Sequence, residues 1–218
     1  GQGLVLTCQM KPTSDCVISI PVPSTACKTG MAKFGGSVAA VRPFHDAAYE
    51  LELAVAEDTP AFLPGQYVNI GVPGSGQHRS YSFSSHSGEQ RMTFLIKHVP
   101  GGLMSSWLAE AQPGAALEMT GPLGSFYLRQ IQRPLLLLAG GTGLAPFLSI
   151  LQDLEAWQRF ERIVLVYSAR DRGELAYQEL IAELPQHQGY EWQVVGTDLI
   201  LVSIATAVIA DVLVDVLC

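Results

Sequence analysis

Charged residues are scarce in this sequence, and basic residues are scarcer than acidic ones. Charged side chains make up 15% of the 218 residues, and the formal net charge is −7 at pH 7. Proteins that bind nucleic acid usually present a basic face, so this balance argues against a nucleic-acid partner. Apolar residues make up 48% of the chain, which is enough for a sizeable core in one large or two ordinary domains.

Cysteines and histidines are also few. The four cysteines, at positions 8, 16, 27 and 218, are too sparse for a disulfide framework in a chain of this length. A reducing, cytoplasmic setting is therefore expected. The five histidines lack the paired helical spacing typical of metal ligands, so the sequence predicts no metal site built from them.

Neither a signal peptide nor a membrane span is evident. Residues 1–10 lack the basic start and the long apolar run of a signal peptide. The stretch 199–210 is apolar and uncharged, but a span needs about twenty such residues. This stretch is expected to form a buried helix or strand, and no membrane partner is predicted.

The segment 78–85, HRSYSFSS, alternates a cation, aromatic rings and small hydroxyls. A strand sends successive side chains to opposite faces, so Arg79, Tyr81 and Phe83 would share one face, with Ser80 and Ser82 on the other. The arginine can pair bidentately with phosphate, and the tyrosine offers a flat face to a ring system. Taken alone, the segment is more typical of an edge strand with a solvated arginine.

Residues 37–127 have a largely β pattern. Short runs of alternating residues lie between glycine- and proline-rich turns, and they predict a small antiparallel barrel. The strands are expected at 49–55, 65–73, 78–85, 92–99 and 116–120.

A short helix is expected at 100–109, where Gly101 and Gly102 precede an apolar turn. The free N–H groups of a helix start, together with the hydroxyl of Ser105 or Ser106, would form an anion site. A pyrophosphate bound there would lie within reach of Arg79. The plainer interpretation is a loop followed by a capped helix.

Residues 133–218 alternate strands and helices. An apolar strand at 135–139 is typical of a parallel sheet covered on both faces. A glycine-rich turn at 140–143 and an amphipathic helix come next, followed by a strand at 163–168, a helix at 174–184 and a strand at 191–195. This order predicts a doubly wound nucleotide-binding unit, with ligand at the carboxyl ends of the strands. The turn does not have the G-x-G-x-x-G spacing, so a purely structural tight turn stays open.

Four motifs in order resemble the ferredoxin–NADP reductase superfamily. They are PGQYV at 64–68, RSYS at 79–82, GLMS at 102–105 and GPLGSF at 121–126. The resemblance implies an antiparallel six-stranded flavin-binding β-barrel followed by an α/β Rossmann-like nucleotide-binding domain. It also implies FAD rather than FMN, because the helix start at 102–105 provides a pyrophosphate site.

The resemblance assigns roles to the residues of the flavin site. Arg79 would hold the flavin phosphates, Tyr81 would pack on the isoalloxazine ring and Ser82 would lie near flavin N5. The FAD-binding residues implied in this way are Arg79, Ser80, Tyr81, Ser82, Gly102, Leu103, Met104 and Ser105.

In the same superfamily, a G-G-T-G turn with a following proline binds the pyridine nucleotide. The reaction it implies is hydride transfer between cofactors, without a general acid or base, lined by Ser82, Thr142 and Cys218. Arg170 could accept a 2′-phosphate, but nearby acidic residues favour NADH. The NAD-binding residues implied are Gly140, Gly141, Thr142, Gly143, Pro146, Ser168 and Arg170.

Residues 7–15 resemble the close of a plant-type [2Fe–2S] ferredoxin domain, with Cys8 in the place of the fourth cluster ligand. The C-x4-C-x2-C run that supplies the other ligands does not occur in this sequence, so no cluster is expected here and Cys8 would be an ordinary thiol. The expected domains are the end of a ferredoxin domain plus a linker at 1–32, the FAD-binding barrel at 33–132, and a C-terminally incomplete NAD-binding domain at 133–218.

Within the superfamily, the chain looks most like the reductase component of benzoate- or anthranilate-type ring-hydroxylating dioxygenases. That branch implies an NADH-dependent FAD reductase that passes electrons through a [2Fe–2S] centre of the full-length protein to a terminal oxygenase. The partner would be the oxygenase or its ferredoxin domain. The alternatives are the reductase of a diiron monooxygenase, a stand-alone NAD(P)H:flavin reductase, and a non-enzymatic ligand-binding barrel.

Overall fold

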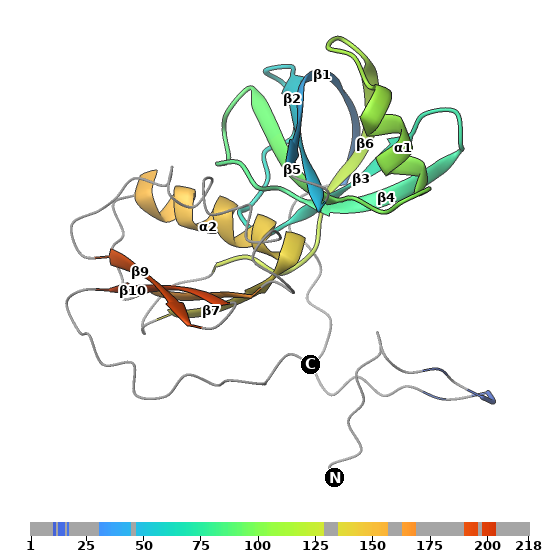
Figure 1. Cartoon of the computed structure of the whole chain (residues 1–218). Coiled ribbons are helices and arrows are strands. Elements are labelled where there is room, and N and C mark those ends of the chain that lie inside the picture. Colours follow the sequence, from blue (N-terminus) through green and yellow to red (C-terminus); the bar gives the residue numbers. More distant parts are fainter. Residues whose placement is uncertain are drawn as a thin grey trace.

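The first sheet consists of six antiparallel strands that curl into a barrel (Figure 1). The computed structural model describes residues 11, 13–15, 17, 31–44, 47–128, 135–156, 163–168, 190–195 and 198–203. In the spatial order β4-β3-β6-β1-β2-β5, the two end strands meet through a bridge between Phe83 and Phe94. The expected six-stranded antiparallel barrel is confirmed. Its strands are β1 (Ala32–Phe44), β2 (Ala48–Val55), β3 (Tyr67–Val72), β4 (Gln77–Ser82), β5 (Arg91–Lys97) and β6 (Ala116–Leu123).

The barrel is filled by its own side chains. Along β2, Leu51 and Leu53 alternate with polar residues and are completely buried. At one end of the barrel, the rings of Phe62 and Phe83 stack with centroids 3.8 Å apart. Helix α1 (Leu103–Glu110) adds Met104 and Leu108 to the same core, which anchors the helix to the barrel.

The second sheet is mixed and has the order β7-β8-β10-β9. Strands β7 (Leu135–Gly140) and β8 (Ile163–Ser168) are parallel, as predicted. The expected strand at 191–195 is β9 (Tyr190–Val195), but it does not pair directly with β8, because β10 (Asp198–Ser203) lies between them and pairs antiparallel with both. Only two residues separate β9 from β10, and so short a connection can return the chain only as an antiparallel hairpin.

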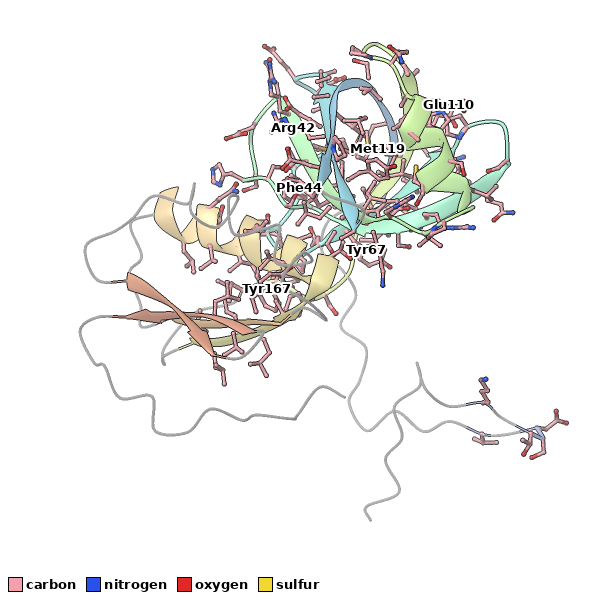
Figure 2. The ribbon with its side chains drawn as sticks, viewed as in Figure 1. Arg42, Phe44, Tyr67, Glu110, Met119 and Tyr167 are labelled. Atoms are coloured by element: carbon pink, nitrogen blue, oxygen red, sulfur yellow. The ribbon has the colours of Figure 1, made fainter. Side chains whose placement is uncertain are left out.

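A 3₁₀ turn and one long helix follow β7. They are η1 (Gly141–Leu144) and α2 (Ala145–Ala156), which lies against one face of the sheet above the buried ring of Tyr167 (Figures 1 and 2). On the opposite face of β7, Leu136 and Leu138 are 63% and 57% exposed. Residues that could cover this face lie outside the described ranges, so the expectation that both faces are covered stays a prediction. The helix expected at 174–184 lies outside the described residues.

The two units share an apolar seam. The core cluster around α2 includes Ala48 and Leu95 on the outer surface of the barrel, and Phe44 packs against it. In addition, η1 contacts β5, and the rings of Phe126 and Phe147 meet edge to face with centroids 5.7 Å apart. This seam sets the nucleotide-binding unit against the strand that closes the barrel. None of the described helices is long and apolar enough to cross a membrane.

Candidate functional site

Strand β4 carries the first group of candidate residues and runs from solvent into the core. Arg79 lies opposite Ile70 and Tyr81 opposite Val68 in the pairing with β3, so both share a face with buried residues. The guanidinium is exposed, the tyrosine is half-buried and Phe83 is completely buried. The predicted alternation of faces is therefore confirmed for this strand.

The Arg79 side chain is accessible and is held only by its own strand. Its Nη1 donates a hydrogen bond to the carbonyl oxygen of His78, and Nη2 donates one to Oε1 of Gln77, each at 2.9 Å. No carboxylate pairs with it among the residues that the structure describes. Because both bonds are exposed, a phosphate can replace them at little cost, and the fork geometry suits bidentate binding.

Tyr81 and Ser82 occupy the half-buried end of β4. The tyrosine ring packs against the barrel core, and this burial raises the pKa of its hydroxyl to about 12, against the opposing effect of the Arg79 charge. The phenol therefore stays neutral at physiological pH, which suits a ring that contacts another ring. Ser82 is paired with Tyr67 of β3.

Helix α1 begins beside β5 without a side-chain cap. Gly102 occupies the N-cap position in extended conformation, and no side chain accepts the first N–H groups of the helix. The helix start at Leu103 and Met104 can therefore bind an anion through its backbone N–H groups. The Ser105 hydroxyl is 5% exposed and used internally: it accepts a hydrogen bond from the Val99 backbone at 2.9 Å. Only the backbone of Ser105 is therefore left for a ligand in this arrangement.

Sequence reasoning missed Gln66 as the residue that ties the motifs together. Gln66 is completely buried, and its Oε1 accepts a hydrogen bond from the Leu63 backbone at 2.8 Å. Its Nε2 donates to the carbonyl oxygen of Gly124 at 3.0 Å. PGQYV and GPLGSF thus form one packed unit, because a Cβ at position 124 would come within 2.9 Å of the Tyr67 ring. The sequence signal that could have identified Gln66 is its position, a polar residue between the turn residues Pro64 and Gly65 and an apolar strand.

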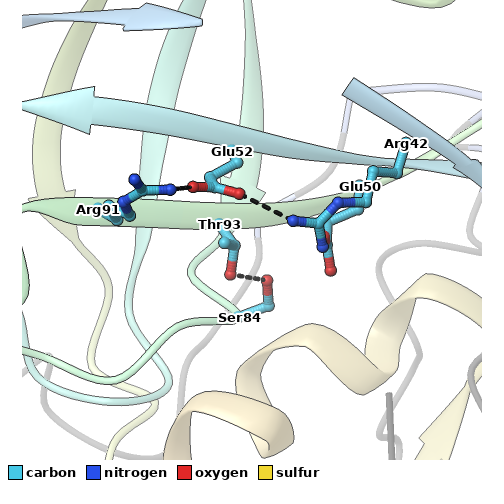
Figure 3. A network of polar contacts seen from close by, with 6 residues as sticks. All are labelled: Arg42, Glu50, Glu52, Ser84, Arg91 and Thr93. Carbon is cyan, nitrogen blue, oxygen red and sulfur yellow. Dashed lines mark hydrogen bonds and ion pairs between the residues drawn. The ribbon is translucent and has the colours of Figure 1, made fainter. Parts of the chain in front are cut away.

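A second polar network holds β2 and β5 on the outside of the barrel (Figure 3). Glu52 pairs with Arg91 and with Arg42, and the Arg42 contact measures 3.1 Å. Although the alternating pattern predicted a half-buried strand with exposed polar residues, Glu50 and Glu52 are only 5% and 6% exposed. The paired arginines offset the cost of burying these carboxylates.

The same figure shows a hydroxyl pair where the segment beyond β4 joins β5. The Ser84 and Thr93 hydroxyls are 2.8 Å apart, and Ser85 Oγ accepts a hydrogen bond from the Thr93 backbone at 3.2 Å. These contacts fasten the predicted flavin strand to β5 immediately beyond Phe83.

The second group of candidate residues surrounds the turn after β7. Gly141 has a φ of +51°, and a Cβ at Gly141 or Gly143 would meet nothing within 4 Å. Open space therefore borders the turn, as close approach of a ligand to the backbone requires. Gly140 is paired with Ser168 in the parallel register, so the structure brings these predicted residues together at the carboxyl ends of β7 and β8. Pro146 lies in the first turn of α2, where proline is well tolerated.

Three of the predicted residues cannot be placed. Cys8, Arg170 and Cys218 lie outside the described residues. Within the described ranges, no group of three or more His, Cys, Asp or Glu side chains is arranged to hold a metal ion. The roles assigned to the individual flavin and nucleotide residues stay predictions.

Two family models match the chain. One describes an oxidoreductase FAD-binding domain and matches residues 45–127, and the other describes an oxidoreductase NAD-binding domain and matches residues 137–201. The first contains the barrel from β2 to β6 and the second begins within β7.

Individual proteins show the same similarity. The chain is 52% identical over 155 residues to the toluate 1,2-dioxygenase electron transfer component of Pseudomonas putida, covering 70% of this chain and 46% of that protein. It is 38% identical over 187 residues to the 2-halobenzoate 1,2-dioxygenase electron transfer component of Burkholderia cepacia, covering 84% and 55%. The structure of phthalate dioxygenase reductase matches with a TM-score of 0.61 at 26% identity, covering 69% of this chain and 48% of that one. The chain spans about half the length of the curated relatives it matches.

Proposed function

This chain belongs to the ferredoxin–NADP reductase superfamily, with one FAD-binding and one NAD-binding oxidoreductase domain, and on that premise we propose that it is the flavin- and nucleotide-binding part of an NADH-dependent reductase. The reductase supplies electrons to an aromatic-ring dioxygenase. The relatives named as electron transfer components of toluate and 2-halobenzoate dioxygenases support this choice of partner.

The position of the glycine turn carries the proposal. The turn residues of η1 contact β5, and β5 meets the segment beyond β4 through the Phe83–Phe94 bridge and the Ser84–Thr93 hydroxyl pair. The two predicted cofactor sites are thus one strand apart. A nicotinamide bound at the turn can therefore approach a flavin bound along β4, as direct hydride transfer requires.

The residues present suit the two cofactors. Arg79 is exposed and has no carboxylate partner within the described part of the chain. Together with the uncapped start of α1 at Gly102, it suits phosphate groups. Tyr81 offers a neutral ring, and the space beside Gly141 and Gly143 admits a ligand close to the backbone. Ser82 and Thr142 would line the region between the two rings.

When bound, the cofactors would supply the redox chemistry, namely hydride transfer from nicotinamide to flavin and single-electron transfer onward to an iron–sulfur centre. The residues of this chain would bind and orient the two cofactors and exclude water from between them. The next carrier would be a [2Fe–2S] ferredoxin domain, and the final acceptor a terminal oxygenase.

Absorbance spectroscopy of the purified chain tests the proposal. The chain should carry or take up FAD, and its flavin band should bleach with NADH and more slowly with NADPH. A band that does not bleach with either nucleotide, but does bleach with dithionite, would contradict the proposal.

Variants at two positions test the assigned residues separately. Arg79→Ala should leave the fold intact and largely remove bound FAD, whereas Arg79→Lys, which keeps the charge without the fork, should retain part of it. Gly141→Val should take up FAD and be reduced by dithionite but not by NADH, because its side chain would fill the space beside the turn. Full flavin content in Arg79→Ala would show that β4 does not hold the phosphates.

A further inference from the structure

A polar contact joins the barrel to α2 in addition to the apolar seam. Ser87 Oγ donates a hydrogen bond to Oδ1 of Asp153 at 3.1 Å, and Nδ1 of His86 lies 3.4 Å from the same oxygen. The side chains of His86 and Asp153 are 27% and 23% exposed. Each thus lies largely inside the junction between the two units.

We propose that His86, Ser87 and Asp153 form an interdomain latch, a set of positioning residues that holds the nicotinamide turn at the correct distance from the flavin strand. This inference rests on the proposed function, because it concerns the alignment of the two cofactor sites. It gives a role to residues that touch neither predicted cofactor site.

The latch connects the two binding elements through short, ordered segments. His86 lies four residues beyond Ser82, at the end of the segment that Ser84 and Ser85 fasten to β5. Asp153 lies eight residues beyond Ala145 on the helix that begins where η1 ends, about 12 Å along the axis at the rise of an α-helix. Movement of Asp153 therefore tilts α2 and carries the glycine turn with it.

The polar contacts of the latch constrain the orientation of α2, which the apolar seam alone does not. The apolar contacts between the two units belong to a core cluster that includes Ala48 and Leu95 of the barrel and buried residues of α2. Burial of apolar surface is non-directional, so such a seam permits small rotations. Hydrogen bonds depend strongly on angle, and the polar contact at Asp153 opposes rotation about the seam.

Two unpaired polar atoms indicate that the junction can close further. Among the described residues, the buried side-chain nitrogen and oxygen atoms without a hydrogen-bond partner are His86 Nδ1 and Ser149 Oγ. Ser149 lies one helical turn before Asp153 on the same side of α2. The Asp153 carboxylate lies 3.4 Å from His86 Nδ1, so a slight approach of α2 would complete this bond.

The chemistry requires a hydrogen on Nδ1. Both the Nδ1–H tautomer and the imidazolium can donate to the carboxylate, whereas the Nε2–H tautomer would direct a lone pair at it. This requirement provides a matched pair of substitutions. The amide nitrogen of asparagine can occupy the position of Nδ1, whereas that of glutamine occupies the position of Nε2.

Transient kinetics of the FAD-loaded full chain test the latch. In Asp153→Ala, the rate constant for flavin reduction at saturating NADH should fall about tenfold, because small misplacements of reacting groups are costly. Flavin content, dithionite reduction and the NADH concentration at half-saturation should change little. His86→Gln should resemble Asp153→Ala, and His86→Asn should retain a rate close to the original. Gln90→Ala is the control, because it removes a 2.9 Å surface bond to Glu57 within the barrel alone.

Hydrogen–deuterium exchange provides a readout independent of turnover. With or without FAD, Asp153→Ala and His86→Gln should speed amide exchange in residues 84–88 and in α2, while Gln90→Ala and His86→Asn should not. Equal loss in His86→Asn and His86→Gln, or unchanged rates and exchange in both Asp153→Ala and His86→Gln, would overturn the latch. A native chain whose flavin NADH cannot reduce would contradict the proposed function instead, and the exchange data would still decide whether the latch exists.

Discussion

The barrel and the nucleotide-binding unit differ in where their cores come from. Where the structure describes the chain, the barrel core is built from residues of the barrel and its helix α1, with Phe83 and Phe94 among its completely buried side chains. The core around α2 includes Ala48 and Leu95, which belong to the outer surface of the barrel. The barrel is therefore self-contained, whereas the second unit is completed by docking on it.

This difference links folding to function. Because the glycine turn contacts strand β5 of the barrel, the two proposed cofactor sites would come into register when the second unit docks. Polar groups inside the barrel, such as Gln66, are satisfied by short internal bonds. At the junction, by contrast, His86 Nδ1 and Ser149 Oγ have no hydrogen-bond partner among the described residues. On the proposed function, the barrel would hold the flavin site and the junction would be the part that can adjust.

The largest effect is expected from Phe94→Ala, which opens the barrel core. Phe94 is completely buried and forms the bridge that closes the sheet. Truncation of a buried phenylalanine should lower the free energy of unfolding by about 3–5 kcal/mol. Urea denaturation monitored by circular dichroism measures the loss, and both units should unfold together. A second unit that keeps its protection against hydrogen exchange would show that it does not depend on the barrel.

Leu95→Ala tests the opposite face of the same strand. Leu95 is 4% exposed and packs in the core around α2, while its neighbours Phe94 and Ile96 point into the barrel. A loss of about 3 kcal/mol is expected, confined to the second unit. Limited proteolysis should release or degrade residues after 134 while the barrel persists and still binds FAD. Equal loosening of both units would contradict the separation of the cores.

Sequence patterns predicted the barrel well because its strands alternate between clear turns. The expected strand at 49–55 is β2, and the one at 116–120 is the first part of β6. β1 was missed because Gly35 and Gly36 interrupt its apolar pattern. Gly36 reflects crowding rather than a turn, since a Cβ at that position would lie 3.0 Å from Met119 and 3.2 Å from the Ala54 carbonyl oxygen.

The second unit was harder to predict, for a physical reason. An apolar run such as 135–139 indicates a buried strand but does not say which faces are covered, and Leu136 and Leu138 prove to be exposed. Motif matching found β4, the helix start and the glycine turn, which are local in sequence. The latch between His86 and Asp153 joins residues 67 positions apart, and no local pattern reports such a contact.

Two glycine substitutions, one in each unit, are expected to have effects of intermediate size. Gly65 has a φ of +101°, and an added Cβ would collide with the Phe126 carbonyl oxygen, so Gly65→Ala should cost about 2 kcal/mol. Gly143 faces open space, so Gly143→Ala should change stability by less than about 0.5 kcal/mol. The latter should nevertheless weaken NADH binding, measured by titration of flavin bleaching. A strong loss of stability in Gly143→Ala would show that the turn is structural.

The smallest effect is expected from Tyr81→Phe and appears only in alkali. Burial raises the pKa of the Tyr81 hydroxyl from 10.0 to about 12, with the Arg79 charge acting against it. The folded state therefore keeps this proton after the unfolded chain has lost it, so the stabilising contribution is complete below about pH 10 and is lost as the pH rises towards 12. The native chain should lose stability more steeply over this interval than Tyr81→Phe, with the two nearly equal at neutral pH. Urea midpoints and phenolate absorbance across the interval measure both effects. Since the barrel's own core buries the ring, the high pKa of Tyr81 should persist in Leu95→Ala. A return of that pKa towards 10.0 in this background would show that the second unit, rather than the barrel alone, shields the flavin strand.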